Sequence, residues 1–91
     1  MRKSIRLTLS GSIQGMFFRQ FIKDNADKNG VKGFVRNLED GKVEVFIEGL
    51  VENVNSMAEI CRKGPPHAQI RNVEEKDERF QDFKEFKIIR F

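Results

Sequence analysis

The stretch GSIQGMFFRQ, from Gly11 to Gln20, places two glycines and one arginine within ten residues. A glycine-bearing loop that enters a helix can turn its backbone N–H groups toward one anion, and the helix dipole adds positive potential there. Arg19 falls at the start of that helix, and its planar guanidinium can bind two oxygens of one phosphate. Because a cation in the first helical turn opposes the dipole, a bound anion would offset the repulsion. The stretch therefore predicts a site for a small phosphate-like ligand.

The loop does not match the glycine-rich motifs of nucleotide-binding proteins. In a P-loop the last glycine is followed by Lys and then Ser or Thr, whereas here Met16 follows Gly15. The dinucleotide fingerprint Gly-x-Gly-x-x-Gly is also absent from the sequence. The sequence thus predicts phosphate binding without a nucleotide-binding motif.

Hydrophobic periodicity predicts the two elements that flank this loop. Apolar residues alternate with polar ones over residues 3–10, which is typical of a strand, and Gly11 and Gly15 then break the regularity. Apolar residues at helical spacing follow, and Asn29-Gly30 is a good helix stop. The alternating residues are Ile5, Leu7 and Leu9, and those at helical spacing are Phe18, Phe21, Ile22 and Ala26.

The rest of the chain reads as strand, strand, helix and strand. Residues 31–37 and 42–48 flank Asp40-Gly41, a hairpin signal, and should form an antiparallel pair. A second amphipathic helix spans 51–61, and Lys63-Gly64-Pro65-Pro66 ends it. A fourth strand passes through Ala68, Ile70 and Val73, and a further apolar segment runs from Phe83 to Ile89.

This order predicts an α+β fold of the ferredoxin-like type, βαββαβ. Two helices should cover one face of a four-stranded antiparallel sheet, to which the segment 83–89 could add a short fifth strand. With 91 residues, we expect one domain over residues 1–91.

Composition narrows the cell compartment and the partners. A single cysteine, Cys61, allows no internal disulfide and favours a reducing, cytoplasmic location, and one histidine, His67, allows no zinc cluster. No segment is long enough to span a membrane. A net charge of +3 is only a mild bias toward anionic partners. We expect a monomer that binds neither nucleic acid nor membrane.

Two motifs in this order resemble one family. Residues 11–19 are similar to the first acylphosphatase signature, Gly-x-Val-Gln-Gly-Val-x-Phe-Arg, with Ile13 and Met16 as apolar replacements. The stretch GFVRNLEDGKVEVFIEG, residues 33–49, resembles the second signature of that family, and Gly64-Pro65-Pro66 resembles its segment before the fourth strand. The residues that match the second signature are Gly33, Phe34, Asn37, Gly41, Val43 and Gly49.

The resemblance implies a ferredoxin-like sandwich that hydrolyses small acyl phosphates, with inorganic phosphate or sulfate able to occupy the same site. By this resemblance, Arg19 binds the phosphate together with backbone amides of the loop, and Asn37 holds the attacking water. The loop amides concerned are those of Gln14, Gly15, Met16, Phe17 and Phe18.

Hydrolysis of an acyl phosphate needs few catalytic groups, and the two motifs offer only a few. Its leaving group is a carboxylate, whose conjugate acid has a pKa of about 4, so departure needs no general acid. The metaphosphate-like transition state mainly requires positioning and charge stabilisation. Neither motif offers a Cys or His nucleophile or a carboxylate cluster for Mg²⁺, so we expect no metal or other cofactor. Phosphate monoesters, with a poor leaving group, should remain nearly untouched.

Several prominent residues also have plain structural interpretations. Phe18 is expected in the core, Cys61 as a buried inert thiol, and His67 as a surface residue. Arg19 could be a solvated helix arginine and Asn37 a strand-end residue, but their places in the two motifs favour functional roles.

Three alternatives remain open. An RNA-recognition module shares the element order, and Phe34 and Phe46 could stack on bases, although Lys32–Val35 matches only the start of its signature. The chain could also be a detached acylphosphatase-like domain of a carbamoyl-transfer enzyme, or a phosphate sensor without turnover. Shared fold does not decide among these functions.

Overall fold

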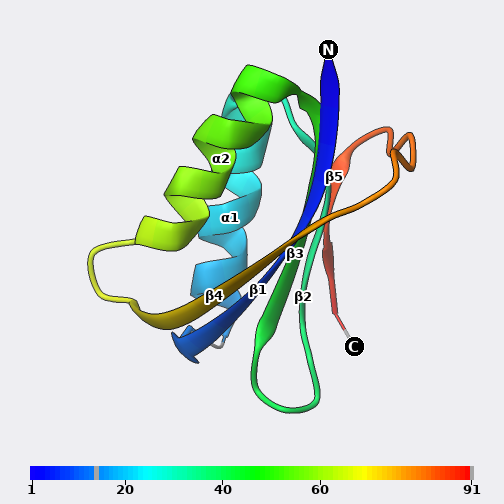
Figure 1. The fold of residues 1–91 in the computed structure, drawn as a ribbon. Coiled ribbons are helices and arrows are strands. Elements are labelled where there is room, and N and C mark those ends of the chain that lie inside the picture. The colour runs from blue at the N-terminus through cyan, green and yellow to red at the C-terminus, as the bar shows by residue number, and fades with distance from the viewer. Residues whose placement is uncertain (14, 91) are drawn as a thin grey trace.

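The computed structural model describes residues 1–13 and 15–90. The described part of the chain contains two helices and five strands, and Figure 1 shows both helices on the same face of the sheet. In chain order these are β1 (Arg2–Ser12), α1 (Met16–Lys28), β2 (Lys32–Asn37), β3 (Val43–Leu50), α2 (Val51–Lys63), β4 (Gln69–Asp77) and β5 (Phe86–Ile89). The predicted βαββαβ order is therefore confirmed, and the predicted segment 83–89 forms a short strand over its last four residues only, Phe86–Ile89.

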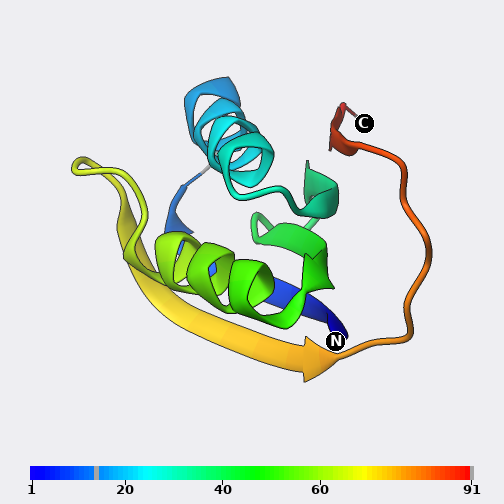
Figure 2. The same cartoon turned by 90° about the horizontal axis from the view of Figure 1, so that it is seen from above.

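The five strands form one mixed sheet in the order β4-β1-β3-β2-β5. The pairs β1–β3, β1–β4 and β2–β3 are antiparallel, as predicted, whereas β5 runs parallel to β2. Residues 78–85 connect β4 at one edge of the sheet to β5 at the other (Figure 2). We call residues 78–85 the strap.

β1 continues two residues beyond the predicted range of 3–10, because its pairing with β4 shifts at Ser10 and Gly11 and then resumes. Gly11 has φ 142°, and a Cβ on it would lie 1.9 Å from the carbonyl oxygen of Gln69. Only glycine allows β4 to approach this closely. The residue that seemed to end the strand therefore forms an irregularity within it.

The core lies between the two helices and one face of the sheet. Phe18 and Cys61 are both buried in it, which confirms their predicted structural roles. Burial raises the pKa of the Cys61 thiol to about 12, although neighbouring Arg62 lowers it slightly, so the thiol stays protonated and unreactive at neutral pH. No helix in the described part of the chain has the length and apolar character to cross a membrane.

The other face of the sheet carries a small aromatic cluster under the strap. Phe34 on β2 stacks on Phe46 of β3 with ring centroids 5.7 Å apart, and Phe83 of the strap packs against Phe34 at 5.7 Å and Phe46 at 5.3 Å. Phe46 is only 1% exposed. These rings pack against one another instead of forming an open platform for bases, which removes the main support for the RNA-binding alternative.

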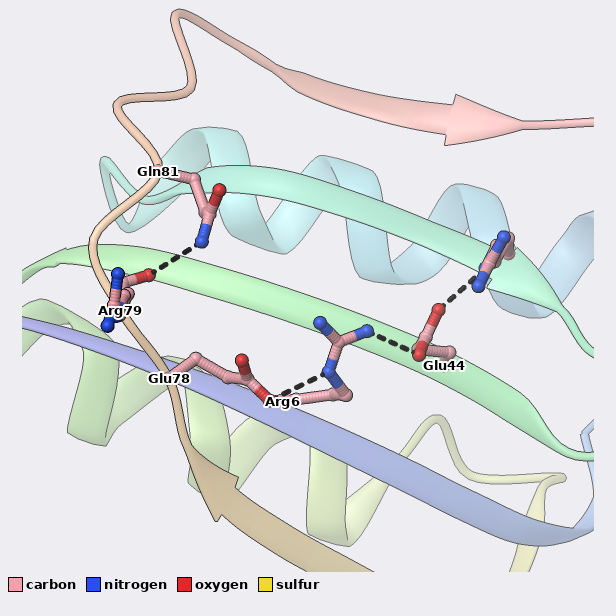
Figure 3. Close-up of polar contacts among 6 residues, drawn as sticks. Arg6, Glu44, Glu78, Arg79 and Gln81 are labelled. Atoms are coloured by element: carbon pink, nitrogen blue, oxygen red, sulfur yellow. Dashed lines mark hydrogen bonds and ion pairs between the residues drawn. The ribbon is translucent and has the colours of Figure 1, made fainter.

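A network of charged side chains lies next to the aromatic cluster, on the same face of the sheet. Arg6 of β1 donates to Glu44 of β3 at 2.5 Å and to Glu78 of the strap at 3.0 Å (Figure 3). Arg36 donates to the other oxygen of Glu44 at 2.6 Å. Burial alone would lower the pKa of Arg6, but its hydrogen bonds to the two carboxylates outweigh that effect and raise the pKa. The network thus joins three strands to the start of the strap.

Glu48 of β3 fastens the middle of the strap. Its side chain is buried, and it accepts hydrogen bonds from Ser4 Oγ at 3.0 Å and from the backbone N–H groups of Gln81 and Phe83, both at 2.7 Å. A buried carboxylate is tolerated when several donors satisfy it in this way. Glu48 therefore connects the strap to the sheet through the backbone of the strap itself.

We expect Glu48→Ala to lower the free energy of unfolding by about 3 kcal/mol, because three hydrogen-bond donors that Glu48 satisfies in the native chain lose their acceptor. Urea denaturation with an unchanged slope would measure the loss. Glu39→Ala removes an exposed carboxylate from the β2–β3 turn and is the matched control, with an expected change within about 0.5 kcal/mol. Equal midpoints for the two variants would show that the aromatic cluster and the Arg6–Glu78 contact hold the strap without Glu48.

Candidate active site

Strand register brings the two sequence motifs to one end of the sheet. Both β1 and β2 are antiparallel to β3, so the carboxyl ends of β1 and β2 lie at the same end of the sheet. Leu9 of β1 and Asn37 of β2 flank the same residue, Val43 of β3. At this end of the sheet only β3 therefore lies between β2, which carries Asn37, and β1, from which the loop leads to α1.

The start of α1 presents backbone N–H groups that have no acceptor within the helix. Gly15 occupies the N-cap position with φ 107°, and no side chain among residues 1–13 and 15–90 caps the helix. The first N–H groups of an α-helix have no acceptor within the helix, and here they belong to Met16, Phe17 and Phe18. α1 has no acidic residue in its first turn to neutralise the positive end of the dipole. Gln14, also predicted to donate its amide, lies outside the described residues.

Gly15 leaves space beside the helix terminus. A Cβ built on Gly15 would find no heavy atom of the described residues within 4 Å, so that side of the loop is open. Its φ of 107° is also one that residues with a side chain rarely adopt. Glycine at this position therefore suits the turn into the helix and leaves space on the side where a side chain would stand.

Arg19 turns back toward this loop. It is half-buried, and its Nε donates to the carbonyl oxygen of Gly15 at 3.3 Å. The backbone N–H of Arg19 reaches the same oxygen at 3.5 Å and closes the first helical turn. Among the residues that the structure describes, neither terminal nitrogen of the guanidinium has a hydrogen-bond or salt-bridge partner. The two terminal nitrogens of the guanidinium thus remain to bind an anion beside the first-turn amides.

Asn37 presents an unusual buried acceptor. Strand alternation places its side chain on the same face as the buried Val35, toward the helices. Its Oδ1 is buried, and within residues 1–13 and 15–90 it is the one buried side-chain oxygen or nitrogen that has no hydrogen-bond partner. Buried polar atoms in folded proteins nearly always have a partner, because an unpaired one costs about 1–3 kcal/mol. Oδ1 is therefore a buried acceptor whose hydrogen-bonding capacity is not used by the described residues.

The remaining predicted residues separate into buried and exposed positions. Phe18 is buried and can offer only its backbone amide to the loop, Met16 is half-buried, and the Phe17 ring is 75% exposed. His67 is exposed, as expected. No three His, Cys, Asp or Glu side chains in the described part of the chain gather as metal ligands would.

Phe17 was expected only as an amide donor, and its exposed ring was not predicted. The signal was present, since Phe17 lies out of phase with the buried residues of α1. Those buried residues are Phe18, Ile22 and Ala26.

Comparison with known proteins identifies the family of this chain. The family model described as acylphosphatase matches residues 5–88. An acylphosphatase from Pyrobaculum aerophilum is 46% identical over 89% of this chain and 87% of its own, and one from Rubrobacter xylanophilus is 43% identical over 84% and 69%. The solved structure of an acylphosphatase from Coxiella burnetii superposes with a TM-score of 0.90 at 31% identity, covering 97% of this chain and 93% of that one. The chain therefore belongs to the acylphosphatase family.

Proposed function

We propose that this chain hydrolyses the carboxyl–phosphate bond of small acyl phosphates, and that it does so without a metal ion. The observation that carries the proposal is the buried Oδ1 of Asn37, which has no partner among the described residues and lies at the same end of the sheet as the start of α1. An acceptor for water and a group of donors for phosphate are the two requirements of a hydrolytic phosphoryl transfer.

The phosphate group binds at the start of α1 in this proposal. Its oxygens accept hydrogen bonds from the amides of residues 14–18 and from the two terminal nitrogens of Arg19, which have no partner in the described part of the chain. These donors carry positive charge, and they face the oxygens on which negative charge is spread in the transition state. The existing contact between Arg19 Nε and Gly15 holds the guanidinium beside the loop before substrate arrives.

Asn37 positions the nucleophile. Its Oδ1 accepts a hydrogen bond from a water molecule and aims the water oxygen at phosphorus, opposite the acyl oxygen. The new bond joins the water oxygen to phosphorus, while the old bond to the acyl oxygen breaks and its electron pair leaves with the carboxylate. An amide cannot act as a base at neutral pH, so the proton of the water passes to a phosphate oxygen of the substrate. The products are a carboxylate and inorganic phosphate.

The proposal predicts a narrow substrate class. We expect hydrolysis of benzoyl phosphate at an unchanged rate in the presence of EDTA, because no step requires a metal ion. Phenyl phosphate, whose leaving group is a phenoxide, should remain intact in the same assay. Release of inorganic phosphate, followed over time for both compounds, measures the difference.

Inorganic phosphate is the probe for the binding half of the proposal, and we expect competitive inhibition of benzoyl phosphate hydrolysis. Competitive binding without any turnover would instead support the phosphate-sensor alternative. Loss of activity in EDTA that returns on adding Mg²⁺ would contradict the proposed chemistry.

A further inference from the structure

The exposed ring of Phe17 belongs to the first turn of α1, beside the candidate site. The Phe17 side chain is 75% exposed, whereas the buried residues of α1 are Phe18, Ile22 and Ala26. The neighbouring Phe18 packs against Phe21 at 6.4 Å, but Phe17 is absent from every ring and cation–π contact among the described residues. Leaving a phenylalanine ring in water forfeits about 1.5–3 kcal/mol of burial free energy.

Helix geometry directs this ring toward the loop. Phe17 is the second residue of α1, two positions after Gly15 and two before Arg19. Bonds from Cα to Cβ in an α-helix tilt toward the amino terminus, so a first-turn side chain extends past the helix end. The Phe17 side chain therefore leans toward the loop that contains Gly15, where a Cβ would meet no described atom within 4 Å.

The direction of attack places the acyl group on the side of Phe17. In an in-line displacement the attacking and leaving oxygens lie on opposite sides of phosphorus. Oδ1 of Asn37 is buried, so in the proposed mechanism water attacks from the protein side. The acyl group must then leave toward solvent, where the exposed ring of Phe17 is available.

We infer that the Phe17 side chain contacts the acyl group and gives the enzyme a preference for acyl phosphates with an apolar, planar acyl group. The inference rests on the proposed function and adds its substrate class. A planar acyl group can stack on the ring or meet its edge, and a larger apolar surface gains more from that contact than a methyl group does.

The test compares two substrates that share the phosphate group and differ in the acyl group. For Phe17→Ala we expect kcat/KM for benzoyl phosphate to fall about tenfold. For acetyl phosphate the loss should stay within about twofold, since a methyl group offers little surface. Phe17→Tyr keeps a ring and should retain the preference of the wild type. Inhibition by inorganic phosphate should be equal in all variants, because the phosphate contacts are unchanged.

Phe80→Ala is the matched control. Phe80 is also an exposed phenylalanine, at 44%, but it lies beside Arg2 at the opposite end of β1, with the guanidinium 5.0 Å from its ring centroid. This variant should leave the ratio of the two substrates unchanged. A ratio that does not fall in Phe17→Ala, with normal turnover and phosphate inhibition, would overturn the role of Phe17 alone. Absence of turnover in the wild type would overturn both this inference and the proposed function.

Discussion

Arg19→Ala is expected to lower kcat/KM for benzoyl phosphate by about a thousandfold or more. Loss of a single preorganised donor typically costs about 10²–10³ in rate, and loss of an arginine that stabilises phosphoryl transfer costs about 10³–10⁵. In this chain the guanidinium is already held at the loop by Gly15, and its two terminal nitrogens are free of described partners. Steady-state kinetics on purified protein measures the effect.

Arg19→Lys separates charge from geometry. Lysine keeps the positive charge but cannot present two parallel N–H donors to one phosphate. It also lacks the Nε donor that reaches the Gly15 carbonyl. We expect activity about a hundredfold below the wild type, closer to the alanine variant than to the native enzyme. Activity near the wild-type level would show that a point charge suffices and would contradict the forked binding mode.

Stability should change little when Arg19 is removed, which distinguishes a functional arginine from a structural one. A cation in the first turn opposes the helix dipole, so Arg19→Ala without phosphate should be as stable as the wild type or a few tenths of a kcal/mol more stable. Added phosphate should raise the melting temperature of the wild type but not of the variant. Lys28→Ala removes the same charge at the other end of α1 and should retain both activity and the phosphate response.

The elements that carry the site were predictable because their patterns are local. Alternation of Ile5, Leu7 and Leu9 specified β1, and the Asp40-Gly41 turn specified the β2–β3 hairpin. Once that hairpin and the strand order are known, the register follows and Asn37 must lie near the loop after β1. The resemblance of two motifs to one family pointed to the same pair of segments.

The strap could not be predicted, because long-range contacts fix it. Residues 78–85 are mostly charged or polar and have no periodicity, and their backbone is held by Glu48, more than thirty positions earlier in the chain. The extension of β1 was missed for the same reason, since the approach of Gln69 decides that Gly11 remains in the strand. The unpaired state of Asn37 Oδ1 also depends on every group around it and appears only in three dimensions.

Asn37→Ala is expected to lower kcat for benzoyl phosphate by about a hundredfold to a thousandfold. Water would still reach the phosphate, but without an acceptor to fix its position, and a displacement of about 1 Å can cost about 10² in rate. Inhibition by inorganic phosphate should be nearly unchanged, because the amides and Arg19 remain. A lower kcat with intact phosphate binding is the signature of a residue that positions the nucleophile.

The stability of Asn37→Ala gives the decisive comparison with a purely structural role. A strand-end asparagine whose oxygen held a turn would lose about 1 kcal/mol or more on truncation. Here Oδ1 has no partner among the described residues, so its removal should leave the free energy of unfolding unchanged or raise it. Asn72→Ala, which truncates an exposed asparagine on β4, controls for loss of the amide.

Asn37→Asp keeps the size of the side chain but adds a negative charge facing the phosphate, so this variant should also weaken inhibition by inorganic phosphate. Full activity in Asn37→Ala, or a large loss of stability, would remove Asn37 from the mechanism and leave its buried oxygen without an explanation.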